Sequence, residues 1–207
     1  PYAIRVRWAL LICENRIEIR EIDLKNKPIE FINKSRSKTV PILLKKNNEV
    51  IEESLDIVIW ALSESKNKNI KNLYMPNSKR EEILETIYEN DHSFKYHLDR
   101  FKYSTRFSAI DEDYHFLEAN KFINKWNNTI KDNRFLIGDN PSIADWCIWP
   151  FVRQFKIACE SQKKTSYFDE PIKQWLGYFE KHENFKKLMH KYEPWRPSTK
   201  KYYFPFN

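Results

Sequence analysis

Glycine is nearly absent from this chain of 207 residues, which contains only Gly138 and Gly177. Nucleotide-binding loops place several glycines at fixed spacing, because only a residue without a side chain lets the backbone approach phosphate groups closely. Two isolated glycines can form neither the Rossmann fingerprint nor a P-loop. The sequence therefore argues against a kinase, a GTPase and a Rossmann dehydrogenase.

Cysteine and long apolar runs are also scarce. The three cysteines, Cys13, Cys147 and Cys159, are too few and too scattered for a disulfide framework, and they include no C-x-x-C pair. The longest apolar runs, residues 8–13 and 57–62, are six residues each, whereas a membrane-spanning helix needs about 20. We expect reduced, mostly buried cysteines, no membrane segment, no signal peptide and a cytoplasmic location.

Positive charge is in excess, with 36 Lys and Arg against 29 Asp and Glu and a net charge of +7. Such an excess is compatible with a nucleic-acid partner, an anionic surface or a lysine-rich solvated surface. The basic clusters are dispersed and no nucleic-acid-binding signature is visible, so we favour the solvated surface. A metal site is not expected either, because His92 and His97 are five positions apart and lie on different faces of a helix.

The first third of the chain mixes helices and strands. Apolar side chains at helical spacing predict a helix over residues 4–12, and β-branched residues predict a strand over 17–24. A short helix over 28–33, a strand over 40–44 and a returning strand at 50–51 follow, and the last two form a hairpin. Ser54 then begins a helix with one apolar face and with Glu53 and Asp56 at its positive end.

The rest of the chain predicts helices only. A stretch rich in Ser, Lys and Asn, residues 65–76, marks a linker, and beyond it apolar residues recur at helical spacings. We therefore expect a first domain over 1–64 and an all-helical domain over 77–207. Ser142 and Asp145 have the spacing of a capping box at a helix start, so we assign Asp145 a role in folding.

This order of elements resembles that of a glutathione transferase whose first strand precedes Pro1. Five motifs carry the resemblance. They are Pro-Tyr-Ala at 1–3, which is like the end of the C-P-[FY]-A motif of cysteine-type, omega-like bacterial members; Lys27-Pro28; Thr39-Val40-Pro41; Glu53-Ser54; and residues 136–149 with their capping box. The resemblance extends over nearly the whole chain. It implies an α/β thioredoxin-like N-terminal domain followed by an all-α C-terminal domain.

The resemblance also implies a glutathione site in the first domain. A cis peptide bond ahead of Pro41 turns the main chain of Val40 toward the cysteinyl backbone of glutathione, which adds as a short strand. Ser54 and the first amides of its helix hold the γ-glutamyl carboxylate, and Glu53 holds the ammonium group. Lys27 offers its charge to the glycine carboxylate. An ordinary strand-entry proline, a helix cap without a ligand and a solvent-exposed lysine are the alternatives.

The resemblance leaves the catalytic residue unknown. In the family motif the nucleophilic cysteine stands immediately before the position of Pro1, so we expect Pro1 to be preceded by further residues of a longer chain. The positive end of the first helix is expected to lower the thiol pKa of that cysteine, which favours disulfide exchange with glutathione. Cys13 lies about three turns along the same helix within an apolar run, and we expect it to pack in the core.

Two further segments could contact a substrate or pack in the core. Tyr103 and Arg106 resemble a stretch on the second-substrate side of some bacterial members, where an aromatic ring and a guanidinium suit an apolar or anionic co-substrate. Helix packing and a surface ion pair explain them as well. The C-terminal tail is rich in aromatic residues and is expected to pack on the helical domain or to cover the cleft.

The sequence thus predicts a glutathione transferase that catalyses thiol–disulfide exchange or conjugates small electrophiles, with glutathione as co-substrate. A homodimer is expected by analogy with the family. The alternative is a non-catalytic protein of the same fold that binds or regulates a partner.

Overall fold

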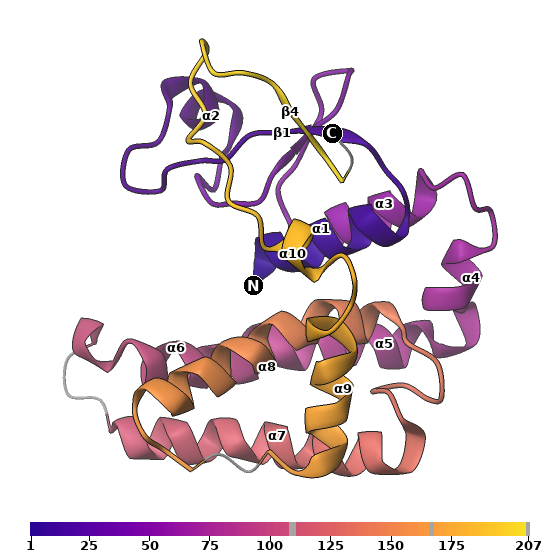
Figure 1. Cartoon of the computed structure of the whole chain (residues 1–207), viewed down its shortest axis with the longest axis vertical. Coiled ribbons are helices and arrows are strands. Elements are labelled where there is room, and N and C mark those ends of the chain that lie inside the picture. Colours follow the sequence, from indigo (N-terminus) through magenta and orange to yellow (C-terminus); the bar gives the residue numbers. More distant parts are fainter. Residues whose placement is uncertain (108–110, 166–167, 206–207) are drawn as a thin grey trace. The chain divides into compact units, whose positions relative to one another are not determined.

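The computed structural model describes residues 1–107, 111–165 and 168–205. The chain divides into two compact units, Pro1–Lys71 with Glu183–Asn207, and Asn72–His182. Figure 1 labels the helices of both units and the strands β1 and β4. None of the described helices is both long and apolar enough to cross a membrane.

The first unit is the thioredoxin-like domain. Helix α1 (Tyr2–Ile12) follows Pro1, and strand β1 (Ile17–Ile19) leads to helix α2 (Ile29–Lys34), which begins after Pro28. Strands β2 (Leu43–Leu44) and β3 (Val50–Ile51) form the predicted antiparallel hairpin, and helix α3 (Ser54–Ser63) packs against α1. The elements agree with the predicted order, although β1 and β2 are shorter than the strands predicted over residues 17–24 and 40–44.

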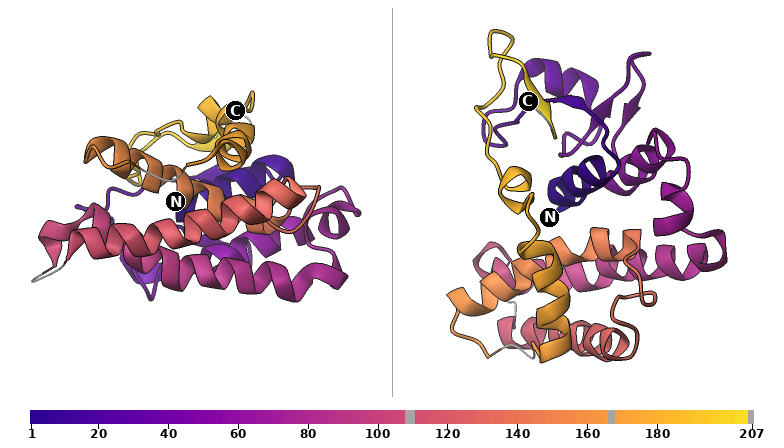
Figure 2. Two further views of the ribbon diagram at one scale, coloured as in Figure 1. Left: turned by 90° about the horizontal axis from the view of Figure 1, so that it is seen from below. Right: turned by 45° about the vertical axis from the view of Figure 1, so that its right-hand side comes forward.

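The C-terminal tail completes this unit by strand pairing. Strand β4 (Tyr202–Phe204) lies antiparallel to β1, with Phe204 opposite Ile17, and short helix α10 (Phe185–Leu188) contacts α1. Figure 2 shows the tail running beside the strand and the helix of its own unit. The first compact unit therefore differs from the expected first domain, because the expected boundary assigned residues 183–207 to the helical domain. The tail instead buries Phe204 against the first unit, at 1% exposure.

The second unit consists of helices. It holds α5 (Arg80–Glu89), a π-helical turn (Asn90–Phe94), α6 (Lys95–Lys102), α7 (Glu112–Asn133), α8 (Ile143–Ser161) and α9 (Glu170–Glu180), with short 3-10 turns at Asn77–Lys79 and Ser104–Arg106. Helix α4 (Ile70–Tyr74) lies within the segment expected as a linker. Helix α8 is the most buried and contacts α5, α6 and α9, while α7 packs on α6 and α9.

The predicted capping box begins α8. The Ser142 hydroxyl accepts a hydrogen bond from the amide of Ala144 at 3.2 Å, and Asp145 Oδ2 accepts from the amide of Ser142 at 2.8 Å. Both groups are buried, so the side chains satisfy amides that no water could reach. The prediction that Asp145 serves folding agrees with these contacts.

Candidate functional site

The main chain at Val40 is the centre of the candidate site. The peptide bond between Val40 and Pro41 is cis, as expected from the sequence. Within the part of the chain that the structure describes, neither the amide nor the carbonyl of Val40 forms a hydrogen bond. The residue is half-buried, and β2 begins only at Leu43. A segment with unpaired backbone groups can receive the backbone of a peptide ligand as an added strand.

Two side chains brace the loop that leads to Val40. The Lys27 ammonium donates to the carbonyl oxygen of Lys38 at 2.8 Å, and Glu52 accepts from the amides of Arg36 and Ser37 at 2.6 and 3.0 Å. These amide bonds hold the pKa of the Glu52 carboxyl below its ordinary value. The loop is therefore tied on one side to the segment before α2 and on the other to the end of β3.

Lys27 thus lies beside the loop, and one of its three donor positions is in use. The ammonium group is linked to a carbonyl two residues before Val40. The remaining N–H groups can serve a carboxylate ligand beside the same loop, as the resemblance implies.

The N-terminal end of α3 comes directly after Glu52 in the chain. Glu53 occupies the N-cap position and is exposed, and no side chain caps the helix. The amide of Ile57 bonds the Glu53 carbonyl, which leaves the amides of the first turn for other acceptors. Because helix N-termini attract anions, this end suits a carboxylate.

Ser54 differs from the expected open cap in one respect. It is only 4% exposed, and its hydroxyl oxygen accepts hydrogen bonds from Arg5 in α1. Arg5 and Glu52 were not predicted from the sequence as residues of the site. A signal for Arg5 was present, because a charged residue interrupts the apolar helix at a spacing of three from Trp8, on the side that packs.

The cysteines of the chain are poor nucleophiles. Cys13, Cys147 and Cys159 are all buried and free of disulfides. Burial raises the pKa of Cys13 to about 12 and, as the largest cause, that of Cys159 to about 12. Thiols with such pKa values stay protonated at neutral pH, so the interpretation of Cys13 as a core residue agrees with the structure.

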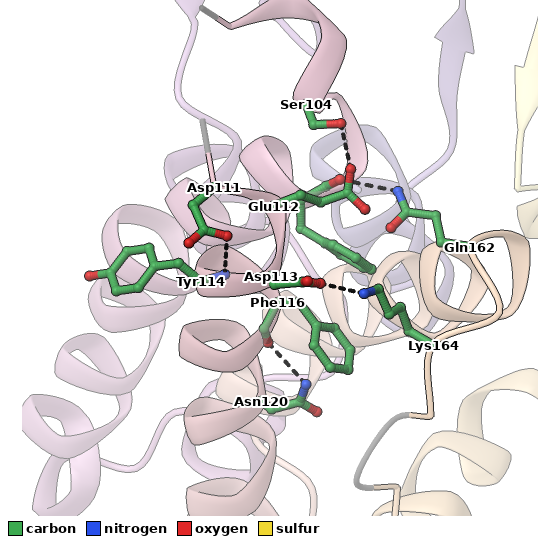
Figure 3. Close-up of polar contacts among 10 residues, drawn as sticks. Ser104, Asp111, Glu112, Asp113, Tyr114, Phe116, Asn120, Gln162 and Lys164 are labelled. Carbon is green, nitrogen blue, oxygen red and sulfur yellow. Dashed lines mark hydrogen bonds and ion pairs between the residues drawn. The ribbon is translucent and has the colours of Figure 1, made fainter. Parts of the chain in front are cut away.

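Tyr103 and Arg106 lie together in the second unit. Tyr103 ends α6, and the Arg106 guanidinium lies 4.0 Å from the centre of its ring. Ser104 between them donates to Glu112 of α7 at 2.7 Å. Figure 3 shows this contact beside the ion pair of Asp113 with Lys164 from the end of α8. The aromatic ring and the guanidinium are therefore presented by an anchored turn.

Metal ligands do not gather in the described residues. No group of three or more His, Cys, Asp or Glu side chains in 1–107, 111–165 and 168–205 could hold a metal ion. His97 does not pair with His92, but its Nδ1 lies 2.9 Å from Nδ1 of His115.

Comparisons with known proteins agree with the resemblance found in the sequence. Residues 1–69 match the family model of the glutathione S-transferase N-terminal domain, and residues 97–196 match that of the C-terminal domain. A search of curated protein sequences finds no match.

Solved structures of glutathione transferases share the fold. A poplar enzyme is 19% identical, with a TM-score of 0.70 over 91% of this chain and 92% of its own. An omega enzyme of Trametes versicolor is 16% identical, with a TM-score of 0.75 over 93% and 82%. Gtt2 of Saccharomyces cerevisiae is 17% identical, with a TM-score of 0.70 over 91% and 96%.

Proposed function

The chain belongs to the glutathione S-transferase superfamily, and from this premise we propose that it binds glutathione along residues 38–41 and at the start of α3. We further propose that it is a cysteine-type transferase which exchanges thiols and disulfides or conjugates small electrophiles. The observation that carries the proposal is the unpaired main chain of Val40 on a loop braced by Lys27 and Glu52.

In this proposal each group of the site meets one part of the tripeptide. The Val40 amide and carbonyl pair with the cysteinyl backbone, and Lys27 attracts the glycine carboxylate. The first amides of α3 and the Ser54 hydroxyl hold the γ-glutamyl carboxylate, and the exposed Glu53 carboxylate binds the ammonium group.

Cysteine-type chemistry requires the cysteine that the family motif places directly ahead of Pro-Tyr-Ala. Its thiolate attacks the sulfur that glutathione contributes to a mixed disulfide, which releases the other thiol and leaves the enzyme joined to glutathione. A second glutathione thiolate then releases the cysteine and forms glutathione disulfide. The amides at the start of α1 would stabilise the thiolate.

Titration calorimetry with glutathione tests the site. The Lys27→Met variant loses a charge that faces a carboxylate, so we expect its Kd to rise about tenfold, which corresponds to about 1.4 kcal/mol. Lys25→Met is the matched control, because Lys25 is an exposed lysine two positions away, and its Kd should stay unchanged. Equal affinity of both variants and the wild type would contradict the proposed site.

A binding or regulatory protein of the same fold is the second candidate. It would bind glutathione without consuming a glutathione–cysteine mixed disulfide, so an assay of the turnover of that disulfide separates the two functions. The excess of positive charge is the observation that favours it. Nucleic acid that co-purifies and dissociates steeply with salt would support this second function.

We also propose a cytoplasmic homodimer, as expected from the sequence and the family. Supporting it, α5, α6 and α7 carry four large exposed side chains, namely Tyr88, Tyr96, Tyr114 and Leu117, each 45% exposed or more. Exposed apolar groups of this size often mark an interface. Light scattering should give twice the chain mass for the wild type, and a monomer for Leu117→Asp.

A further inference from the structure

A buried contact joins α1 to the start of α3. The Arg5 side chain is 1% exposed, and it donates from Nε at 3.1 Å and from Nη2 at 2.8 Å to the single hydroxyl oxygen of Ser54. The two residues are 49 positions apart, and both belong to the first unit. The fork of a guanidinium is rigid, so two such bonds fix the position of the oxygen.

This contact determines what the hydroxyl can still do. A serine hydroxyl has one hydrogen to donate and two lone pairs to accept with. Nε and Nη2 of Arg5 donate to the lone pairs of the Ser54 oxygen, so the hydroxyl hydrogen remains to donate to another acceptor. Among the described residues no acceptor takes the hydrogen of Ser54. A hydroxyl held in this way is a donor only, and the adjacent positive charge strengthens its donated bond.

We propose that Arg5 is a positioning residue of the γ-glutamyl subsite, where it fixes the Ser54 hydroxyl as a donor to the ligand's α-carboxylate. The inference rests on the glutathione site proposed above. It adds to that site the residue that sets its preference for an anion over a neutral group. Arg5 acts through Ser54, because the guanidinium is buried and two of its donors bind the Ser54 hydroxyl.

A purely structural role of Arg5 makes a different prediction. The guanidinium also lies 4.9 Å from the centre of the Tyr2 ring, so its removal costs stability in either case. Lost stability lowers the folded fraction for every ligand alike. Only a positioning role changes how well the folded protein distinguishes an α-carboxylate from an α-carboxamide.

The test therefore compares two ligands, glutathione and its analogue with the γ-glutamyl α-carboxylate converted to a carboxamide. The ratio of their Kd values is measured by calorimetry on the wild type, Arg5→Met, Ser54→Ala and the double variant. We expect the preference for glutathione to fall about tenfold in each single variant and no further in the double variant, since the two groups act in series. Effects that multiply in the double variant would overturn the inference, and so would an unchanged ratio in folded Arg5→Met.

A second variant and a control for ligand binding complete the test. If Arg5→Met does not fold, Arg5→Gln takes its place. Its side chain retains an amide donor without the charge, so we expect the preference of this variant for glutathione over the carboxamide analogue to fall at least about threefold. A wild-type ratio in folded Arg5→Gln overturns the inference. A wild type that binds neither ligand contradicts the glutathione site itself, which separates failure of the proposed function from failure of the role of Arg5.

Discussion

The Nδ1 atoms of His97 in α6 and His115 in α7 lie 2.9 Å apart, within hydrogen-bond distance. One nitrogen must donate and the other accept, so at least one of the two rings is neutral. Burial lowers the pKa of both histidines, and the charge of the partner ring lowers the pKa of His97 further. The charged groups that act on the pair are Arg100, Asp111, Glu118 and Lys121, and the rings packed on it are Tyr96, Tyr114 and Phe122.

The second unit should accordingly lose stability in mild acid. A histidine whose pKa is lower in the folded than in the unfolded chain binds fewer protons when folded, so its contribution is present above the ordinary pKa of about 6.5 and is lost as the pH falls below it. Between about pH 7.5 and 5.5, we expect Tm to fall by about 2–4 °C more in the wild type than in His115→Leu. Parallel curves for the wild type and His115→Leu would show that the pair does not titrate on unfolding.

The histidine pair also shows which contacts a sequence can predict. Ser142 and Asp145 are three positions apart in one helical turn, and their capping box followed from spacing alone. His97 and His115 are 18 positions apart on two helices, and Arg5 and Ser54 are 49 apart. Contacts of this kind depend on how helices pack, which helical periodicity does not specify. The order of elements and the cis bond before Pro41 were predictable, but the bracing of Val40 by Glu52 was not.

Asp145 should be among the residues most costly to replace. It is fully buried and accepts four hydrogen bonds, from the amides of Leu136 and Ser142, the hydroxyl of Ser142 and the indole of Trp175. Burial raises the pKa of the carboxyl, and these bonds oppose that change. Asp145→Ala leaves the donors unpaired in the core, so we expect the free energy of unfolding to fall by about 3–5 kcal/mol in urea titrations. Asp139→Ala, at an exposed site nearby, should change it by less than about 0.5 kcal/mol.

The cysteines of the chain should not react with thiol reagents while the protein is folded. With pKa values of about 12 for Cys13 and Cys159, the thiolate fraction at neutral pH is negligible, and Cys147 is buried as well. We expect no rapid reaction of residues 1–207 with a thiol reagent such as DTNB under native conditions, and three thiols per chain after unfolding in guanidinium. A rapidly reacting native thiol would identify one of these cysteines as accessible, and alkylation followed by peptide mapping would locate it.

The sequence predicted that the aromatic tail packs on the helical domain or covers the cleft, and the helical domain was the wrong partner. The tail instead pairs through β4 with β1 of the first unit, and the amide of Trp195 donates to the Glu21 carbonyl at 2.7 Å. Neighbouring side chains of a strand point to opposite faces, so Phe204 is buried at 1% exposure while Tyr203 is 37% exposed.

The two neighbours therefore form a matched pair of positions for testing the tail. Phe204→Ala removes a buried ring and leaves a cavity, so we expect a loss of about 3–5 kcal/mol in the free energy of unfolding. Tyr203→Ala removes only an exposed ring that lies 4.7 Å from the Arg16 guanidinium, and the loss should stay below about 1 kcal/mol. Limited proteolysis should then cleave the tail of Phe204→Ala much faster than that of Tyr203→Ala, because local opening of β4 exposes its backbone. Equal cleavage rates would mean that β4 is not held to β1 by the buried ring.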